Sequence, residues 1–168
     1  MGDLPPVDLS GDITERINAS HNEGMDLVLS YVDAEGRPHQ SIRGSTHVHR
    51  PDQIAIWVRE SYVGTMTPTR PPLANGGFLK AIESNPAVSL IYRNATSRTT
   101  YVFSGRARVE TDQALRDEIY ANMPASEQRH SEDHSGTAVI VDIDHVVGGT
   151  LVNGAPTEKV EMAANSRS

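Results

Sequence analysis

An arginine flanked by hydroxyl side chains is the feature of this sequence with the clearest chemistry. Arg43 has Ser41 two residues before it and Ser45 two residues after it. Side chains alternate between the two faces of a strand, so this spacing predicts that all three share one face. A guanidinium group makes paired, charge-assisted hydrogen bonds to phosphate. The pattern indicates a phosphate site, and an exposed arginine in a surface ion pair is the alternative.

A second candidate lies at residues 75–80, which read Asn-Gly-Gly-Phe-Leu-Lys. Free backbone amides at the start of a helix bind anions, and Lys80 would follow one turn later. The alternative is an ordinary loop-to-helix transition with a solvated lysine.

Two histidines, His47 and His49, are spaced to lie on one face of a strand, where imidazoles can bind a metal. A third ligand would have to come from elsewhere, with Asp52 and His39 as the possibilities. We favour two partly exposed histidines and no metal. The sequence contains neither a Gly-x-Ser-x-Gly nucleophile motif nor a Walker phosphate loop, and we assign no catalytic acid or base.

The elements that must position these residues are mostly strands. Runs rich in β-branched and aromatic residues predict strands at 25–32, 39–50, 53–59, 87–92, 100–109 and 136–147. Gly36 marks the turn of the first hairpin, at residues 33–38. Short helices are expected at about 10–24, where Ile13 and Ile17 share a face, at 78–82, and at 111–123, where Thr111-Asp112 provides the cap. Strands joined by hairpins predict a mainly β (α+β) fold, a curled antiparallel sheet or small barrel.

The chain divides into three parts. Residues 1–24 are expected to form an N-terminal arm and short helix, 25–150 the barrel, and 151–168 a flexible C-terminal tail. A long irregular loop is expected from residue 60 to residue 76, because it contains Gly64, Pro68, Pro71 and Pro72, and long loops in compact domains are often functional.

Composition excludes several functional classes. The chain has 168 residues and a formal charge of −7, from 22 acidic and 15 basic residues, which argues against a nucleic-acid-binding protein. Cysteine is absent, so disulfides and thiolate chemistry are excluded. No apolar run is long enough to cross a membrane, and the first residues do not resemble a signal peptide. We therefore expect a cytoplasmic protein with no membrane partner.

Taken in order, these elements resemble the pyridoxamine 5′-phosphate oxidase-like, flavin-binding split-barrel family. The similar segments are 33–39 (DAEGRPH), 54–58 (IAIWV), 79–91 (LKAIESNPAVSLI), 101–109 (YVFSGRARV) and 138–148 (AVIVDIDHVVG). They span about residues 25–149. The resemblance implies a six-stranded antiparallel split β-barrel with short flanking helices, and a homodimer with two cofactor sites at its interface.

The resemblance also implies which residues bind the cofactor. In such proteins the second strand lies along the flavin, and residues at the third strand's end and the following helix start complete the site. Carried onto this sequence, the predicted cofactor-binding residues are Ser41, Arg43, Gly44, Ser45, Thr46, Trp57, Val58, Arg59, Gly77, Phe78 and Lys80.

This sequence departs from the family pattern at three places. Many members have Ser-Arg-Lys before the helix where this chain has Gly-Gly-Phe at 76–78, so Lys80, Arg43, Arg59 or Arg70 would have to supply the phosphate cations. The 60–75 loop is longer than in the oxidase and is expected to reshape the substrate pocket or the phosphate site. The oxidase's C-terminal substrate-binding segment has no counterpart here, so pyridoxamine-phosphate oxidation is not expected.

The leading hypothesis is an FMN-dependent oxidoreductase acting on an unidentified small molecule. Three alternatives remain: a reductase that uses a deazaflavin coenzyme, a non-catalytic flavin-binding or storage protein, and a barrel that has lost its cofactor.

Overall fold

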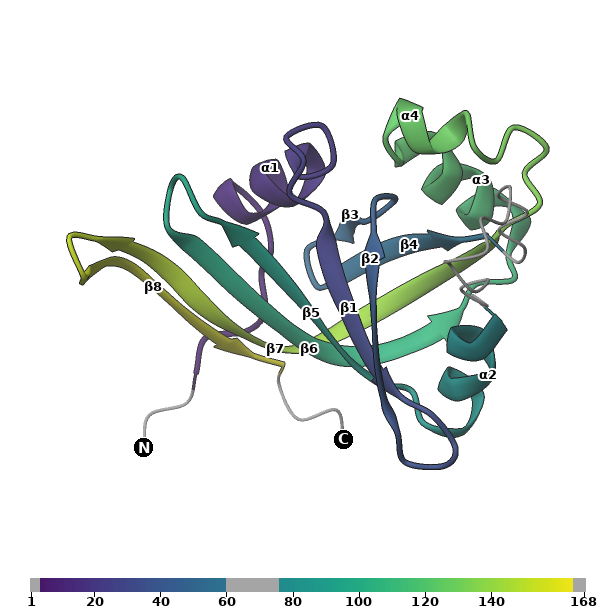
Figure 1. The fold of residues 1–168 in the computed structure, drawn as a ribbon, viewed down its shortest axis with the longest axis horizontal. Coiled ribbons are helices and arrows are strands. Elements are labelled where there is room, and N and C mark those ends of the chain that lie inside the picture. The colour runs from purple at the N-terminus through teal and green to yellow at the C-terminus, as the bar shows by residue number, and fades with distance from the viewer. Residues whose placement is uncertain (1–3, 60–75, 165–168) are drawn as a thin grey trace, which may run out of the picture.

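The computed structural model describes residues 4–59 and 76–164, which form one curled antiparallel sheet with helices at its rim (Figure 1). The strands of this part are β1 (Leu27–Val32), β2 (Pro38–Arg43), β3 (His47–Arg50), β4 (Gln53–Val58), β5 (Ala87–Asn94), β6 (Thr99–Val109), β7 (Thr137–Val152) and β8 (Ala155–Ala163). The helices are α1 (Asp12–Ala19), α2 (Gly76–Ser84), α3 (Gln113–Asn122) and α4 (Ala125–Gln128). Among these residues, no helix has the length and apolar character needed to span a membrane.

The order of the strands explains why the sheet curls. Neighbouring strands run β2-β1-β5-β6-β7-β4-β3, and β8 pairs with β7 outside this path. The two ends of the path, β2 and β3, are consecutive in the chain and are joined only by residues 44–46. Such a link spans no more than about 14 Å between Arg43 and His47. The two edges of the sheet are therefore held close together without pairing, which makes the barrel split.

The first hairpin is fixed by one carboxylate. Asp33 Oδ1 accepts hydrogen bonds from the amides of Glu35 and Arg37, at 3.0 and 2.8 Å. Gly36 has φ of +77°, a conformation that glycine adopts at little cost. This turn sets the register in which Leu27 faces Arg43 across β1 and β2.

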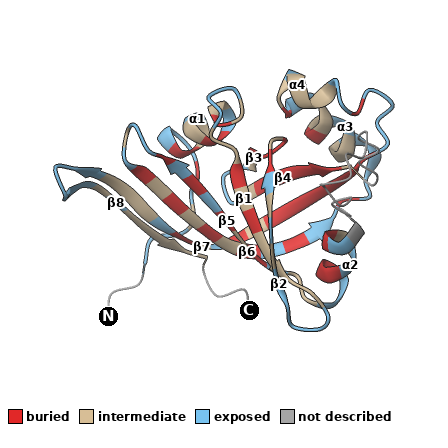
Figure 2. Cartoon of the chain, in the orientation of Figure 1, coloured by how far each residue is buried: buried red, intermediate tan, exposed pale blue. Residues whose placement is uncertain are grey.

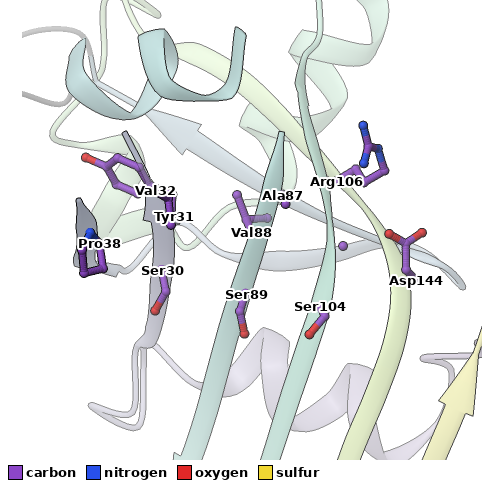
Figure 3. Close-up of a pocket in the computed structure, with 11 residues that line it drawn as sticks. Ser30, Tyr31, Val32, Pro38, Ala87, Val88, Ser89, Ser104, Arg106 and Asp144 are labelled. Atoms are coloured by element: carbon purple, nitrogen blue, oxygen red, sulfur yellow. The ribbon is translucent and has the colours of Figure 1, made fainter. Parts of the chain in front are cut away.

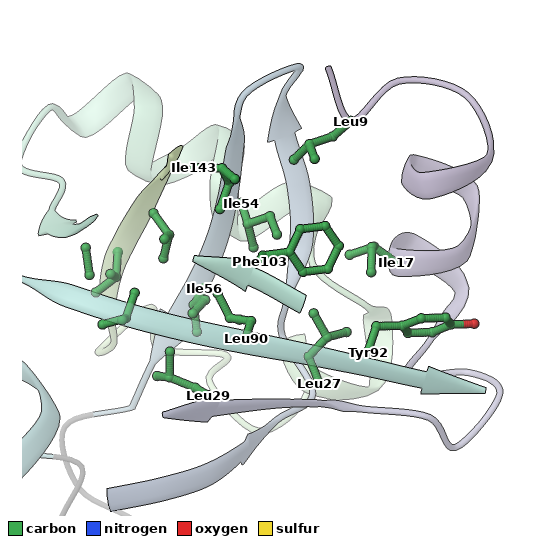
Figure 4. Packing of buried hydrophobic residues seen from close by; sticks show 14 of the residues in the cluster. Leu9, Ile17, Leu27, Leu29, Ile54, Ile56, Leu90, Tyr92, Phe103 and Ile143 are labelled. Carbon is green, nitrogen blue, oxygen red and sulfur yellow. The ribbon is translucent and has the colours of Figure 1, made fainter. Parts of the chain in front are cut away.

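The main core lies on the concave side of the sheet, where alternate residues of each strand are buried (Figure 2). Leucine, isoleucine and aromatic side chains from β1, β4, β5, β6 and β7 meet there, and α1 adds Ile13 and Ile17 (Figure 4). A smaller second cluster lies beneath α3, where Ile119 and Met123 pack against Trp57. The two clusters leave β4 buried on both faces.

Most predicted elements are present, with three corrections. All six predicted strands exist, and Asp112 caps α3 by accepting from the Leu115 amide at 3.0 Å, as expected. The predicted strand at 39–50 is two strands, because the chain turns at residues 44–46. The predicted flexible tail is wrong for residues 151–163, since β7 continues to Val152 and β8 pairs along it. The described sheet therefore has eight strands, not six.

Candidate functional site

Arg43 is the most deeply buried cation of the predicted site. It is the last residue of β2, and only 8% of its surface is exposed. Its guanidinium carbon lies 5.2 Å from the centre of the Phe78 ring, a distance at which a cation is attracted to an aromatic face. Burial lowers the pKa of Arg43, and the positive charge of Arg59 lowers that pKa further. Two guanidinium groups therefore lie near each other where water is partly excluded.

The start of α2 closes one side of this region. Phe78 is fully buried and packs on Tyr31, with ring centres 5.2 Å apart. A side-chain carbon added to Gly77 would lie 3.5 Å from the Tyr31 hydroxyl, so β1 and the helix start are neighbours. The first amides of a helix have no partner within it and attract anions. The lysine predicted to assist, Lys80, lies on the exposed side of α2.

Tyr31 is braced from its other side by the hairpin. The His39 ring stacks on the Tyr31 ring, with ring centres 5.1 Å apart and an angle of 13° between the ring planes. Asp33 Oδ2 lies 2.8 Å from His39 Nε2 and accepts from Arg37 Nε at the same distance. The hydrogen bond to His39 is the main reason that the pKa of Asp33 is far below its usual range. An ionised carboxylate therefore holds the histidine and tyrosine beside the helix start.

Ser41 and Arg43 share the concave face of β2, as predicted, but Ser45 does not extend that row. Because β2 ends at Arg43, Ser45 lies in the following turn. Ser45 Oγ donates to the Trp57 carbonyl at 3.0 Å and accepts from the Trp57 amide at 3.1 Å. The Ser41 hydroxyl is buried and has no hydrogen-bond partner among the described residues. Ser41 is thus the hydroxyl available beside the guanidinium.

Other predicted residues are occupied by structural contacts. Thr46 Oγ1 donates to the Arg43 carbonyl at 2.8 Å, which tightens the turn. Trp57 is 5% exposed, donates from Nε1 to Ser131 Oγ at 3.0 Å, and belongs to the cluster beneath α3. Val58 is fully buried. The assignment of these three residues to a cofactor stays a prediction, and their backbone is what remains to contact a ligand.

Gly44 lies where the fold leaves little room for a side chain, and the sequence does not predict which residues surround it. A side-chain carbon at Gly44 would lie 2.7 Å from His21 Nδ1 and 3.0 Å from Glu127 Oε1. His21 is itself held by Asp26, with Nδ1 2.7 Å from Asp26 Oδ1. The loop after α1 and the helix α4 therefore pack directly on the turn that carries Arg43. These residues are far apart in the chain, and no local pattern links them.

Of the two histidines of β3, His47 contradicts the expectation of partial exposure, and His49 fits it. His47 is only 3% exposed, with Nδ1 3.2 Å from the Ser45 carbonyl, and burial lowers its pKa. His49 is half-buried, and burial lowers its pKa as well. Within residues 4–59 and 76–164, no three histidine, aspartate or glutamate side chains gather in a group suited to a metal.

The convex face of the sheet carries a shallow groove of about 460 Å³ (Figure 3). Ser30, Ser89 and Ser104 stand opposite one another on β1, β5 and β6 and form its floor. Arg106 and Asp144 border it on one side, and Pro38 on the other. The groove therefore combines an apolar lining with a row of serine hydroxyls, and it lies on the far side of the sheet from Arg43.

Comparison with known proteins identifies this architecture. No family model matches the chain, and neither does any curated protein. Solved structures do match. PhzG from Burkholderia lata, in complex with tetrahydrophenazine-1-carboxylic acid, has a TM-score of 0.63 at 6% identity, over 98% of this chain and 90% of its own.

Two further structures agree. A Clostridium acetobutylicum protein related to general stress protein 26 of Bacillus subtilis, of the pyridoxinephosphate oxidase family, has a TM-score of 0.57 at 10% identity, over 86% of this chain and 90% of its own. HupZ of Group A Streptococcus has a TM-score of 0.54 at 17% identity, over 86% of this chain and 98% of its own. This chain has the pyridoxamine 5′-phosphate oxidase-like split-barrel fold.

Within this split barrel, the predicted residues separate into two groups. Arg43, Arg59, Gly77 and Phe78 converge where the end of β2, the end of β4 and the start of α2 meet. Ser45, Thr46 and Trp57 make hydrogen bonds within the protein, and Val58 is buried in the core. The 60–75 loop, with Arg70 and Asn75, lies outside the described residues.

Proposed function

We propose that this split barrel is an FMN-dependent oxidoreductase that acts on a small molecule. The buried guanidinium of Arg43 carries this proposal. Its planar fork of N–H donors, with the charge of Arg59 nearby, matches a phosphate in both shape and charge. The start of α2 lies against the same point, and its first amides add donors.

The residues present fit a phosphate monoester. Arg43 offers a planar pair of donors, Arg59 a second charge, and Ser41 a buried hydroxyl on the same face as Arg43. Gly77, which has no side chain, leaves the approach to the helix start open. These groups replace the Ser-Arg-Lys run that many relatives place before the helix.

FMN, when bound, would supply the hydride or electron chemistry, and the protein would bind and orient it. Arg43 and the helix start would hold the phosphate at a fixed point. The stacked Tyr31 and His39, braced by Asp33, would keep Phe78 and the helix start in place.

We also propose that the protein is a homodimer whose partner covers the convex face. An apolar row crosses five strands there in register: Ile42, Val28, Ile91, Val102 and Val147. Ile42 is 70% exposed, which is unusual for a side chain of its size. A second copy would bury this row, which lies on the same face as the groove of Ser30, Ser89 and Ser104.

The cheapest test is the absorbance spectrum of the purified protein, followed by a melting screen with FMN and with a deazaflavin coenzyme. Flavin bands and a melting temperature that rises with FMN would support the proposal, because a ligand that binds the native state stabilises it. A rise with the deazaflavin alone would favour the reductase alternative. A colourless protein that neither compound stabilises would overturn the proposal.

Arg43→Ala tests the site itself. We expect FMN to bind about a hundredfold more weakly, since two charge-assisted hydrogen bonds are removed. Lys159→Ala removes an exposed cation on β8 and serves as the control, with unchanged affinity. Equal FMN affinity in the Arg43 variant and the native protein would remove Arg43 from the site.

Ile42→Glu tests the dimer. A charge at the most exposed residue of the apolar row, on the edge strand β2, should convert the dimer to a monomer in sedimentation experiments. Val152→Glu changes another exposed apolar residue, near the end of β7 and outside the row, and should leave the dimer intact. A native protein that sediments as a monomer would refute this part of the proposal.

A further inference from the structure

A second recess lies beneath α1, apart from the phosphate site. It has a volume of about 370 Å³, which is near the lower end of the range for small-molecule sites, about 300–1,000 Å³. Its lining comes from α1, the loop after it and the end of β5. The lining residues are Asp12, Glu15, Arg16, Ala19, Glu23, Tyr92 and Asn94. None of them belongs to the proposed flavin site.

The sequence of α1 creates this recess. Asp12, Glu15, Arg16 and Ala19 follow the three- and four-residue spacing that places side chains on one helix face. Ile13 and Ile17 lie on another face and anchor the helix in the core. The helix is therefore fixed by its apolar side and presents a charged side to the end of β5.

Tyr92 forms the inner wall, and its hydroxyl lacks a partner. The residue has 0% of its surface exposed, and its hydroxyl is buried with no hydrogen bond to any described residue. Figure 4 shows this hydroxyl at the edge of the apolar core, directed away from the aliphatic side chains. A buried polar group without a partner is costly, so a native structure normally satisfies it with water or a ligand.

The neighbouring tyrosine shows what Tyr92 lacks. Tyr101 stacks on Tyr92, with ring centres 6.0 Å apart and planes at 19°. The Tyr101 hydroxyl donates to Glu158 at 3.3 Å, whereas Tyr92 lines the recess and its hydroxyl has no acceptor among the described residues. Two stacked tyrosines thus differ in whether a protein acceptor meets the hydroxyl.

Arg16 adds a second unmatched donor. Its Nε is buried and has no hydrogen-bond partner among the described residues. Both unmatched groups can donate to the same kind of oxygen, and a carboxylate accepts from tyrosine and arginine together. The three carboxylates of Asp12, Glu15 and Glu23 line the same recess and favour a positive group beside that oxygen.

We propose that this recess binds a free α-amino acid as a zwitterion. Its carboxylate would accept from Tyr92 Oη and Arg16 Nε, and its ammonium would lie among the carboxylates of α1 and Glu23. This site is independent of flavin chemistry. The proposal therefore stands or falls separately from the proposed oxidoreductase function.

Calorimetric titration of the 168-residue chain with each of the free L-amino acids at millimolar concentration tests the proposal. We expect at least one to bind. Its methyl ester lacks the carboxylate charge and its N-acetyl derivative lacks the ammonium, so each should bind at least about tenfold more weakly. Failure of every amino acid to bind would overturn the proposal, and so would an ester that binds as tightly as its parent.

Tyr92→Phe assigns the binding to this recess. The variant should bind the amino acid about tenfold more weakly or worse, whereas Tyr101→Phe, which changes the stacked neighbour, should bind it normally. Without ligand, Tyr92→Phe should melt no lower than the native protein, because removing an unmatched hydroxyl costs nothing. A lower melting temperature would show that bridging water already satisfies the hydroxyl, and it would overturn the proposal, as would unchanged binding.

Discussion

The turn after β2 and the recess beneath α1 handle charge in opposite ways. At the turn, the guanidinium of Arg43 is buried against an aromatic ring with a second cation nearby. Beneath α1, three carboxylates and one guanidinium surround an open recess with a buried hydroxyl at its wall. A buried charge interacts strongly because little water screens it, whereas an exposed cluster interacts weakly.

The comparison indicates which interactions should provide affinity and which should provide selectivity at the two sites. At the turn, electrostatic attraction supplies most of the affinity for an anion. In the recess, the unmatched hydroxyl and Nε decide which ligand fits, and the carboxylates only bias its charge. Both regions contact the loop after α1, through His21 at Gly44 and Glu23 at the recess. Variants that affect one region and not the other can therefore test whether they are independent.

Gly44→Ala should have the largest effect. The added methyl group would meet His21 Nδ1, which cannot move away easily because Asp26 holds it. We expect a loss of about 1–3 kcal/mol in unfolding free energy, typical of overpacking, and weaker FMN binding, with amino-acid binding unchanged. Urea denaturation and the two titrations measure this.

The double variant Gly44→Ala, His21→Ala provides the control. Removing the imidazole makes room for the methyl group, so part of the lost stability should return. If the losses of unfolding free energy from the two substitutions are additive, the contact between the turn and His21 does not position Arg43.

Arg43→Lys should have the next largest effect. Lysine keeps the charge but loses the planar pair of donors, so FMN should bind about tenfold more weakly, between the native protein and Arg43→Ala. Fluorescence quenching of free FMN measures this. A lysine variant as weak as the alanine variant would indicate that shape, rather than charge, determines binding at the turn.

His47 should make stability depend on pH. Because burial lowers its pKa, the folded state binds fewer protons than the unfolded state just below the ordinary histidine pKa of about 6.5. Stability should be fully present above about pH 6.5 and should fall as the pH drops through that value toward the lower folded pKa.

His47→Gln removes part of this dependence, and His49, whose pKa is also lowered, retains the rest. Urea midpoints at about pH 7.5 and about pH 5.5 should therefore differ less in the variant than in the native protein. An equal difference in both proteins would contradict the assignment to His47.

Asp33→Asn should have the smallest effect, because the hairpin is open to solvent. The pKa of Asp33 is lowered in the folded state by His39 and then by the Arg37 contacts. Its contribution is present above the ordinary aspartate pKa of about 4 and is lost as the pH falls through the lower folded value. The variant should therefore be less stable than the native protein at neutral pH and equally stable in strong acid. A difference in stability between the two proteins that persists in strong acid would indicate a packing effect instead.

The sequence predicts the elements well because their signals are local. Alternation placed the strands, Gly36 the hairpin turn and Asp112 the cap of α3, and each of these depends on neighbours a few residues away. The arginine of the candidate site was also found this way, since Ser41 and Arg43 occur together on one strand face. The split between β2 and β3 was missed because residues 44–46 contain only one turn-forming glycine.

What the sequence does not reveal depends on distant contacts. Nothing near Gly44 indicates that His21 and Glu127 pack on it. The hydroxyl of Tyr101 has an acceptor in Glu158, on β8, whereas that of Tyr92 has none among the described residues. β8 was missed because its polar, charged sequence resembles a tail, and only its pairing with β7 makes it a strand.

The position of β7 also determines when the barrel can form. Among the described residues, β4 pairs only with β3 and β7, and β7 begins at Thr137. During synthesis, β3 and β4 therefore cannot join the sheet until about eighty further residues have been made. The hairpins β1–β2 and β5–β6 can pair earlier, because their partners are nearby in the chain. Nascent chains that stop before residue 137 should expose β4, an apolar strand, and should depend on chaperones or aggregate.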